Sequence, residues 1–279
     1  MKPEYNIDSK IPNKCAWDIK LNGDDLLLSC FTKEQLKSIT KSCNENSQCS
    51  IDYSSMSKKK LFNALVEQLK AYHAQNKDLF IANNVKMSSR LKLDLLKRLK
   101  PYFKDNQFGM LYTEDINAVC FQLNTIYTRF NFCGAFPSDI LNLYKVRYGE
   151  ILAREFYDKI AWVLNTDDHT EYGTHWVVVL VSHQDTSIEY FDSLGRIPNN
   201  NILLFIKKLY KVCERDYNTK YKIKQIGKKI QNSGVNCGVY SIRFIVMRCI
   251  NIPFENVIKD SYMNDTEIEK YKSTLFSNL

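Results

Sequence analysis

The chain has 279 residues, a formal net charge of +8 and a high aromatic content, with 17 tyrosines and 15 phenylalanines. This length supports one large folded domain or two, and the aromatic content excludes a mainly disordered chain. No stretch reaches the ~18 consecutive apolar residues of a membrane-spanning helix and no signal peptide opens the sequence, so we expect no membrane partner.

The first part of the chain is typical of a small helical arm. Short helices are expected before residue 40, apolar residues follow helical spacing over 57–72, and a further helix is expected over 89–99 with Ser89 as its cap. Pro101 ends that helix, and the composition changes shortly afterwards. We therefore predict a helical N-terminal arm over residues 1–105 and a separate core over residues 106–279.

Helical and strand patterns alternate in the core. Helices are predicted over 113–127, after Pro137, over 202–213 and from Cys237 onward, and strands over 161–165, 174–181, 187–191 and 221–226. The expected fold is α+β, a mixed central sheet flanked by helices.

Nine cysteines are scattered along the chain without the spacing of a disulfide framework. Cys43 and Cys49 fit no usual zinc-ligand spacing and have no paired histidine, so we predict no metal. Cys213 and Cys249 fall on apolar helical faces and are expected in the core. An odd count of unframed cysteines is typical of a reducing compartment, and the sequence therefore predicts free thiols.

One cysteine stands apart from the others. Cys237 follows a turn that contains Gly234 and begins an apolar helical pattern. A thiolate at a helix N-terminus is stabilised by the helix dipole, so it ionises more readily than an ordinary thiol. His175 and Asp192 lie upstream and supply the two other groups of a nucleophilic triad.

The spacing of the two strands brings that histidine and aspartate together. If 174–181 and 187–191 form a hairpin with its turn centred between His183 and Gln184, His175 lies directly opposite Asp192. Their Cβ atoms would then be ~5 Å apart on one face of the sheet. A slip of one residue would place them on opposite faces, so this prediction depends on the register.

Each residue has a chemical task in this hypothesis. Cys237 attacks a carbonyl carbon as thiolate, His175 takes and returns the proton, and Asp192 orients the imidazole. Gln231 can donate its side-chain N–H to the developing oxyanion, and losing one such donor typically costs ~2.7–4 kcal/mol of transition-state stabilisation.

The ordered motifs carry a family resemblance. His175-Trp176, Asp192-Ser193 and 231–238 resemble the adenain-like and SUMO-specific cysteine peptidase clan, and the segments 163–167 and 187–191 look like the polyprotein-processing proteases of large cytoplasmic DNA viruses, of the African swine fever virus type. The resemblance covers roughly residues 106–279. The chain departs from cellular SUMO proteases at Asn236, where they usually carry Asp, and from the swine fever type at Asp192, where that type carries Asn.

The resemblance implies a cysteine endopeptidase that cleaves structural polyproteins at Gly-Gly-Xaa sites. It implies that Trp176 roofs a narrow cleft, although a core tryptophan is the alternative, and Asn165 is an auxiliary residue that could equally cap a turn. The alternative functions are an isopeptidase that removes SUMO- or ubiquitin-like modifiers, and an acetyltransferase or inactive interaction protein.

Positive charge gathers in three clusters, which either attract nucleic acid or form solvated basic faces. Some adenain-like proteases use nucleic acid as an activator, so the resemblance allows a nucleic-acid or peptide activator here. We expect no other cofactor. The resemblance places the protein in the host cytoplasm and virion. The clusters are 58–60, 97–104 and 222–229.

Overall fold

The computed structural model describes residues 15, 28–74, 76–96, 98–101, 109–257, 259 and 263–276. The chain divides into two compact units. One comprises residues 1–103 with 274–279, and the other comprises residues 104–273. Among the described helices, none is long and apolar enough to cross a membrane.

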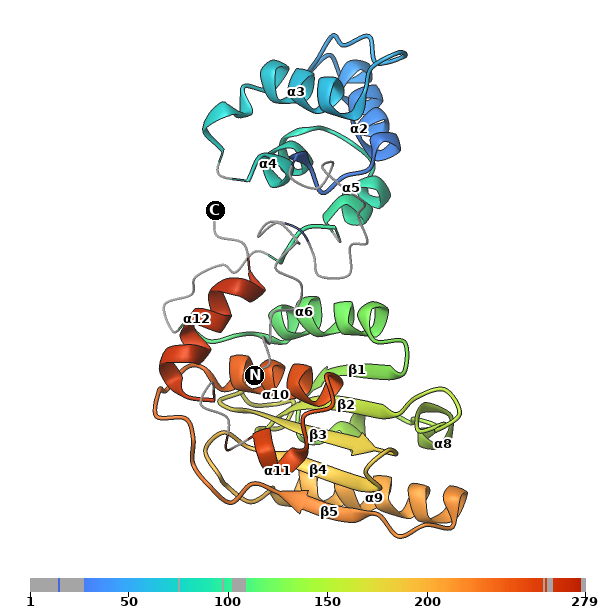
Figure 1. Cartoon of the computed structure of the whole chain (residues 1–279), viewed down its shortest axis with the longest axis vertical. Helices are drawn as coiled ribbons and strands as arrows, with labels where there is room; N and C mark the ends of the chain where they lie inside the picture. The colour runs from blue at the N-terminus through green and yellow to red at the C-terminus, as the bar shows by residue number, and fades with distance from the viewer. Residues whose placement is uncertain are drawn as a thin grey trace, which may run out of the picture. The chain divides into compact units, whose positions relative to one another are not determined.

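The first unit is an arm built from short helices around its own apolar core (Figure 1). Two helix starts follow capping rules, because the hydroxyls of Thr32 and Ser57 accept backbone N–H groups of the first turn. At the last helix of the arm it is Ser88, rather than the predicted Ser89, whose hydroxyl accepts the N–H of Leu91. The elements are α2 (Lys33–Glu45), α3 (Lys58–Gln68), the 3-10 turn η1 (Ala71–His73), α4 (Lys77–Asn84) and α5 (Ser89–Leu96).

Two disulfides correct the prediction of free thiols. Cys15 pairs with Cys30 and Cys43 pairs with Cys49, all within the arm. Cys43 lies near the end of α2, and Ser47 takes a left-handed conformation with φ of 54°, so the chain turns back and brings Cys49 to a Cα distance of 5.3 Å. Cys43 and Cys49, although close in sequence, can therefore pair because the chain reverses direction between them. Comparison with the cysteine spacings of known disulfide frameworks does not detect such a pair.

The second unit contains a five-stranded mixed sheet in the order β1-β2-β3-β4-β5 (Figure 1). The two outer pairs are parallel and the two inner pairs are antiparallel, so the predicted α+β class with a mixed sheet is confirmed. β1 was not predicted. The strands are β1 (Phe130–Phe136), β2 (Lys159–Asn165), β3 (Trp176–Ser182), β4 (Ser187–Phe191) and β5 (Lys222–Gln225).

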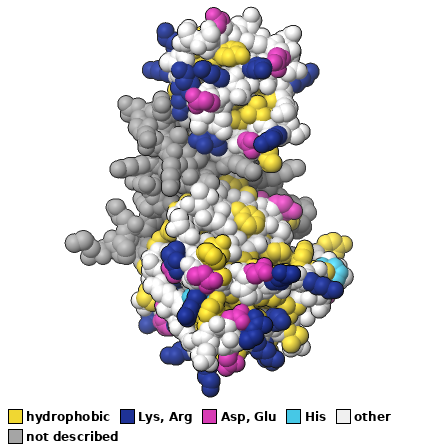
Figure 2. All heavy atoms as spheres, turned by 90° about the vertical axis from the view of Figure 1, so that its right-hand side faces the viewer, with side chains coloured by type: hydrophobic (Ala, Val, Ile, Leu, Met, Phe, Trp, Pro, Cys, Tyr) yellow, Lys and Arg dark blue, Asp and Glu magenta, His cyan; other side chains and the backbone are white. Residues whose placement is uncertain are grey.

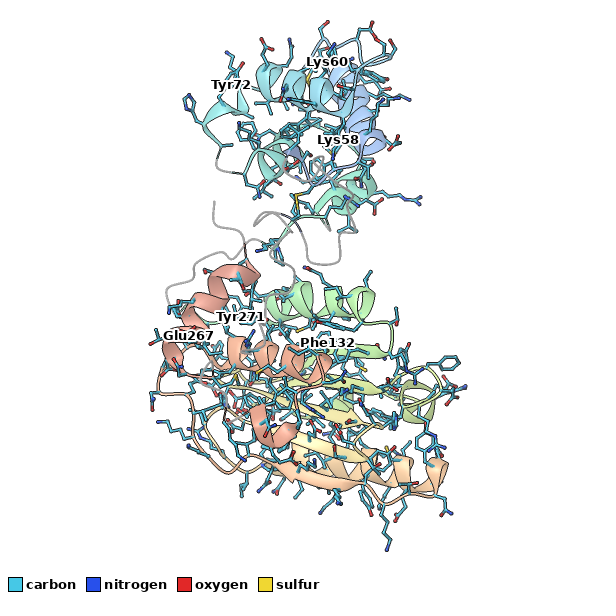
Figure 3. The ribbon with its side chains drawn as sticks, in the orientation of Figure 1. Lys58, Lys60, Tyr72, Phe132, Glu267 and Tyr271 are labelled. Carbon is cyan, nitrogen blue, oxygen red and sulfur yellow. A yellow bond between two sulfur atoms is a disulfide. The ribbon has the colours of Figure 1, made fainter. Side chains whose placement is uncertain are left out.

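Helices cover both faces of the sheet. α9 packs its apolar side on one face, where Trp162 of β2 meets Phe205 with ring centroids 5.4 Å apart. α10 packs on the other face, where Phe244 stacks on Phe191 of β4 at 4.5 Å, and α6 contacts β1 beside it, with Phe121 against Phe132 (labelled in Figure 3). The helices of this unit are α6 (Thr113–Ile126), α7 (Ile140–Leu143), α8 (Tyr148–Ile151), α9 (Asn200–Tyr217), α10 (Cys237–Cys249), α11 (Phe254–Val257) and α12 (Asp265–Leu275).

The β3–β4 hairpin corrects the predicted register. Val178 pairs with Phe191, so His175 is not directly opposite Asp192 but is displaced diagonally along the ladder. The turn is centred one residue later than expected. Thr186 takes a left-handed φ of 50°, and the Ser182 hydroxyl donates to the Asp185 carboxylate and accepts the Asp185 N–H, which together fix the turn there. The observed pairing of the two strands is shifted from the predicted one by an even number of residues. Each side chain therefore stays on its predicted face of the sheet.

Candidate active site

His175 and Asp192 meet at the ends of adjacent strands. His175 immediately precedes β3 and its carbonyl accepts the N–H of Thr166, which continues the β2–β3 ladder. Asp192 immediately follows β4. The Nε2 of His175 lies 2.7 Å from Asp192 Oδ1, and both side chains are buried. The two residues that the sequence predicted as partners are therefore hydrogen-bonded.

Cys237 completes the group as the first residue of α10. Asn236 makes no side-chain cap on this helix, so its first-turn N–H groups are left for other acceptors. Burial alone would lower the pKa of His175, but hydrogen bonds to Asp192 and to Cys237 raise it to about 9. Because Asp192 takes Nε2, Nδ1 is the ring nitrogen available to the thiol. This arrangement places a protonated imidazole ring beside the thiol of Cys237.

The pKa of His175 sets the expected pH dependence. The imidazolium form persists until the pH reaches about 9, whereas an unperturbed histidine loses its proton near 6.5. We expect kcat/KM to decline as pH rises through about 9 because the ion pair then loses its proton. The stability from this histidine should be complete below 6.5 and lost as pH rises through about 9. Turnover and urea unfolding, followed across this range for the wild type and for His175→Ala, measure both effects.

Gln231 is buried in the loop before α10, beside the turn that follows β4. Its Oε1 accepts from the hydroxyl of Ser193 at 2.6 Å, and its Nε2 donates to the carbonyl of Ser233 at 2.6 Å. These two bonds fix which end of the amide carries the protons, so the second N–H of Nε2 is available to a ligand. Ser193 belongs to the Asp192-Ser193 motif, and its contact with Gln231 was not predicted from the sequence.

Gln231→Ala should lower kcat by ~10²–10³-fold with little change in KM, because the donor acts on charge that develops only in the transition state. Steady-state kinetics on a peptide substrate measures the two constants separately. Full activity in this variant would show that the oxyanion is stabilised by other groups.

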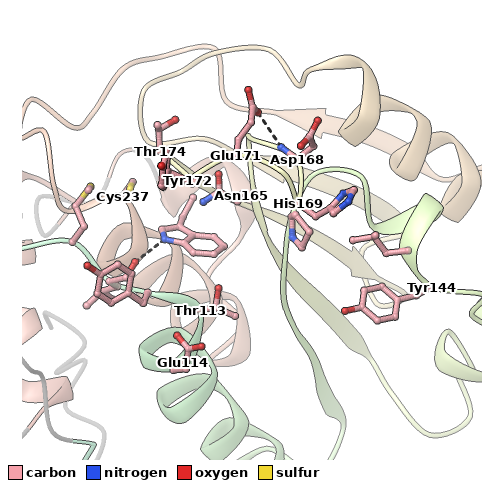
Figure 4. A pocket seen from close by; sticks show the side chains of 17 residues that line it. Thr113, Glu114, Tyr144, Asn165, Asp168, His169, Glu171, Tyr172, Thr174 and Cys237 are labelled. Atoms are coloured by element: carbon pink, nitrogen blue, oxygen red, sulfur yellow. Dashed lines mark hydrogen bonds between the residues drawn. The ribbon is translucent and has the colours of Figure 1, made fainter.

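A cleft of about 410 Å³ begins at Cys237 (Figure 4). Trp176 and Asn165 line its wall, and Tyr144 lies at the far end from the cysteine. The indole Nε1 of Trp176 donates to the carbonyl of Leu111 at 2.8 Å, which fixes the ring. Asn165 accepts the N–H of Asp167, so it makes the turn-capping bond that was the alternative to an auxiliary role, while its side chain also borders the cleft.

Gly238 is explained by close packing. A Cβ at this position would lie 3.0 Å from the Leu111 Cβ, so a larger residue would push Leu111, whose carbonyl binds Trp176, away from the start of α10. Gly234, by contrast, has open space around it.

Two other histidines form hydrogen bonds of their own. His183 is held between the Tyr221 hydroxyl at 2.5 Å and the Leu152 carbonyl at 2.7 Å. His169 is half exposed and its Nδ1 lies 2.6 Å from Asp139 Oδ2, at the edge of the cleft. Within the described residues, no group of three or more His, Cys, Asp or Glu side chains could hold a metal ion.

The fold and the arrangement of these residues are those expected of a cysteine peptidase, with a thiol at the start of a helix beside a histidine and a carboxylate at the ends of two strands. Residues 157–278 match the sequence profile of the Ulp1 protease family, C-terminal catalytic domain. This part of the chain is therefore similar to a cysteine-type peptidase domain of the Ulp1 type, which confirms the resemblance to the SUMO-specific and adenain-like peptidases.

Two viral relatives share this region. The R355 protein of Acanthamoeba polyphaga mimivirus, whose name describes a thiol protease, is 31% identical over 173 residues, which cover 60% of this chain and 57% of that protein. The chain thus spans little more than half of that relative. A SUMO-1 cysteine protease, S273R of African swine fever virus (isolate Pig/Kenya/KEN-50/1950), is 27% identical over 206 residues, which cover 66% of this chain and 75% of the relative.

A solved structure shows the same fold. The crystal structure of the African swine fever virus pS273R protease superposes with a TM-score of 0.65 at 22% identity, over 95% of this chain and 96% of that one. The described α+β architecture is therefore that of this protease.

Proposed function

We propose that this protein is a viral cysteine endopeptidase that processes structural polyproteins at Gly-Gly-Xaa sites. The observation that carries the proposal is the contact of His175 with both Asp192 and Cys237, at the mouth of the cleft that Trp176 lines. The names of the viral relatives support the peptidase class. We further propose that the protein acts in the host cytoplasm and the virion, as the family resemblance implies.

The proposed reaction follows from the geometry. The Cys237 thiolate adds to the scissile carbonyl carbon, and the carbonyl oxygen becomes an oxyanion that accepts an N–H from Gln231. The His175 imidazolium then gives its proton to the leaving amine, and an acyl-enzyme remains. Water, deprotonated by the now neutral His175, hydrolyses the thioester and regenerates the thiol. Asp192 orients the imidazole ring of His175 through their contact at 2.7 Å.

The cleft supports a preference for small residues. Trp176 is buried and its ring is fixed by the bond to Leu111, so it cannot move aside for a bulky side chain next to the nucleophile. Glycine adds no side chain and lets the substrate backbone approach closely. We therefore propose that the two residues on the acyl side of the scissile bond are glycines.

The test is a panel of Gly-Gly-Xaa peptides measured beside fluorogenic C-terminal conjugates of SUMO and ubiquitin, with wild type and Cys237→Ala. Peptide turnover that is lost in the variant, without modifier turnover, is the expected result. Turnover of the modifier conjugates alone would favour the isopeptidase alternative, which the names of the swine fever relatives also support. No turnover of either class, in the presence of nucleic acid and without it, would contradict the peptidase proposal.

Nucleic acid as a partner or activator is a secondary proposal. Some residues of the predicted basic clusters already form hydrogen bonds within the protein. In the arm, Lys58 (labelled in Figure 3) is buried and donates to the carbonyl of Ser29, and Arg98 donates to the carbonyl of Cys30. Burial lowers the pKa of Lys100 to about 8. Lys97 and Lys104 lie outside the described residues.

The basic cluster at 222–229 supports nucleic-acid binding better than the other two, because Lys222, Lys228 and Lys229 are exposed. Lys224, however, pairs with Glu255 at 2.7 Å, and on the face drawn in Figure 2 lysine and arginine are interspersed with acidic side chains. Adding duplex DNA at low salt should raise kcat/KM if the proposal holds, and Lys228→Glu/Lys229→Glu should abolish that increase. Equal rates with and without DNA would exclude it.

A further inference from the structure

The turn after β4 serves both the triad and the oxyanion donor. Asp192 Oδ1 accepts the N–H of Leu194 at 2.7 Å as well as the imidazole, which fixes the carboxylate. Gly195 has φ of +70°, and a Cβ there would lie 2.6 Å from backbone atoms of Lys228 and Lys229. The turn is therefore pressed against the backbone of the segment that leads to Gln231.

Ser193 forms the centre of that contact. It is fully buried, and its carbonyl accepts N–H groups from both Ile230 at 2.9 Å and Gln231 at 3.0 Å. Its hydroxyl donates to Gln231 Oε1 at 2.6 Å. One residue thus holds Gln231 by its main chain and by its side chain.

The Ser193 hydroxyl matters because the two ends of the Gln231 side-chain amide have different hydrogen-bonding roles. Its amide has one acceptor and two donor hydrogens, and one of the hydrogens is taken by the Ser233 carbonyl at 2.6 Å. If the acceptor end loses its partner, the buried Oε1 is left unsatisfied and the side chain gains by turning toward water. Such a rotation would carry the second N–H away from the position at which it could meet an oxyanion.

We propose that Ser193 is a positioning residue for catalysis, which holds the Gln231 amide with its free N–H directed at the reacting carbonyl oxygen. Because the same turn carries Asp192, it sets the distance between the oxyanion donor and the histidine. The inference rests on the proposed peptidase function, since it names the residue that aligns the donor in that reaction. Ser193 itself does not touch substrate.

The test is a double-mutant cycle between Ser193→Ala and Gln231→Ala on the peptide substrate. Ser193→Ala should lower kcat by ~10-fold or more and leave KM and the pH profile nearly unchanged, because only transition-state stabilisation is lost. In the Gln231→Ala background the same change should have almost no further effect on kcat. Equal losses of kcat in both backgrounds, or wild-type kcat in Ser193→Ala, would overturn the proposal.

A matched control separates positioning from general loss of packing. Ser187 is also fully buried, lies at the other end of β4 and donates its hydroxyl to Glu189 at 2.9 Å. Ser187→Ala should change the melting temperature without changing kcat per folded molecule. If Ser193→Ala does not fold, Ser193→Cys is measured in its place, because a thiol fills the site but is a weak donor.

A second readout does not require turnover. The side-chain amide of Gln231, assigned by its loss in Gln231→Ala, can be observed by NMR in the ¹⁵N-labelled full chain. Its protons should exchange faster with solvent in Ser193→Ala than in wild type or Ser187→Ala. Unchanged exchange would refute the positioning role whether or not the wild type cleaves the peptide, while wild-type turnover that Cys237→Ala abolishes establishes the peptidase separately.

Discussion

His175→Ala should reduce kcat by about 10³-fold or more and leave the fold intact, because the ring that exchanges the proton with Cys237 is removed. The small side chain leaves Asp192 with the N–H of Leu194, so the carboxylate keeps one partner at 2.7 Å. Steady-state kinetics and far-ultraviolet circular dichroism measure the two parts of the prediction. KM should change little, since the imidazole is not expected to contact substrate in the ground state.

His183→Ala is the matched control for this experiment. His183 is also largely buried and hydrogen-bonded at both ring nitrogens, to the Tyr221 hydroxyl and the Leu152 carbonyl. Its loss should lower the melting temperature and leave kcat unchanged. A second histidine–carboxylate pair, His169 with Asp139, lies at the edge of the cleft. If His175→Ala retains turnover and His169→Ala loses it, the general base has been assigned to the wrong pair.

The proposed catalytic partners were predictable because their signals are local. β3 is an almost continuous apolar run, β4 is a short strand after a polar turn, and α10 follows a glycine-bearing turn, so the sequence placed His175, Asp192 and Cys237 at the ends of elements. The predicted register was wrong, yet the contact forms, because the error preserved the face and long side chains reach diagonal neighbours in a sheet.

β1 escaped prediction because distant contacts create it. Its sequence contains Asn131 and Gly134, which are poor strand formers, and its pairing with β2 shifts between Phe132 and Gly134. Two backbone N–H groups of this edge strand donate to the side chains of Asn124 and Asn117 on α6. Local sequence patterns do not predict a strand such as β1, which is stabilised by hydrogen bonds with a neighbouring helix.

The partners of charged and polar groups were equally hidden. The sequence offers 39 basic and 31 acidic residues, and periodicity cannot say which of them meet inside the protein. Lys58 was expected on a basic face and is buried, and Ser193 was part of a motif whose contact with Gln231 appears only in three dimensions. Such choices depend on the packing of elements far apart in the chain.

Arg248 illustrates the largest of these hidden effects, and its replacement by alanine should lower the free energy of unfolding of the core by ~3–5 kcal/mol. The guanidinium is almost fully buried on α10, and its bonds to Glu189 are 2.8 and 2.9 Å long. It also bonds Asp185 and the carbonyl of Ile252. Without it, Glu189, which is fully buried on β4, is left as an uncompensated charge.

The physical cause can be separated from loss of packing by two comparisons. Burial raises the pKa of Glu189 and the Arg248 charge opposes that rise, so the pair Arg248→Met/Glu189→Gln should recover most of the lost stability because no buried charge remains. Arg129→Ala, which removes an exposed ion pair with Asp158, should change stability little. Urea unfolding followed by tryptophan fluorescence reports on the core through Trp162 and Trp176. If the double variant were as unstable as Arg248→Ala, the loss would come from packing, and the ion pair would not be what holds α10 against β4.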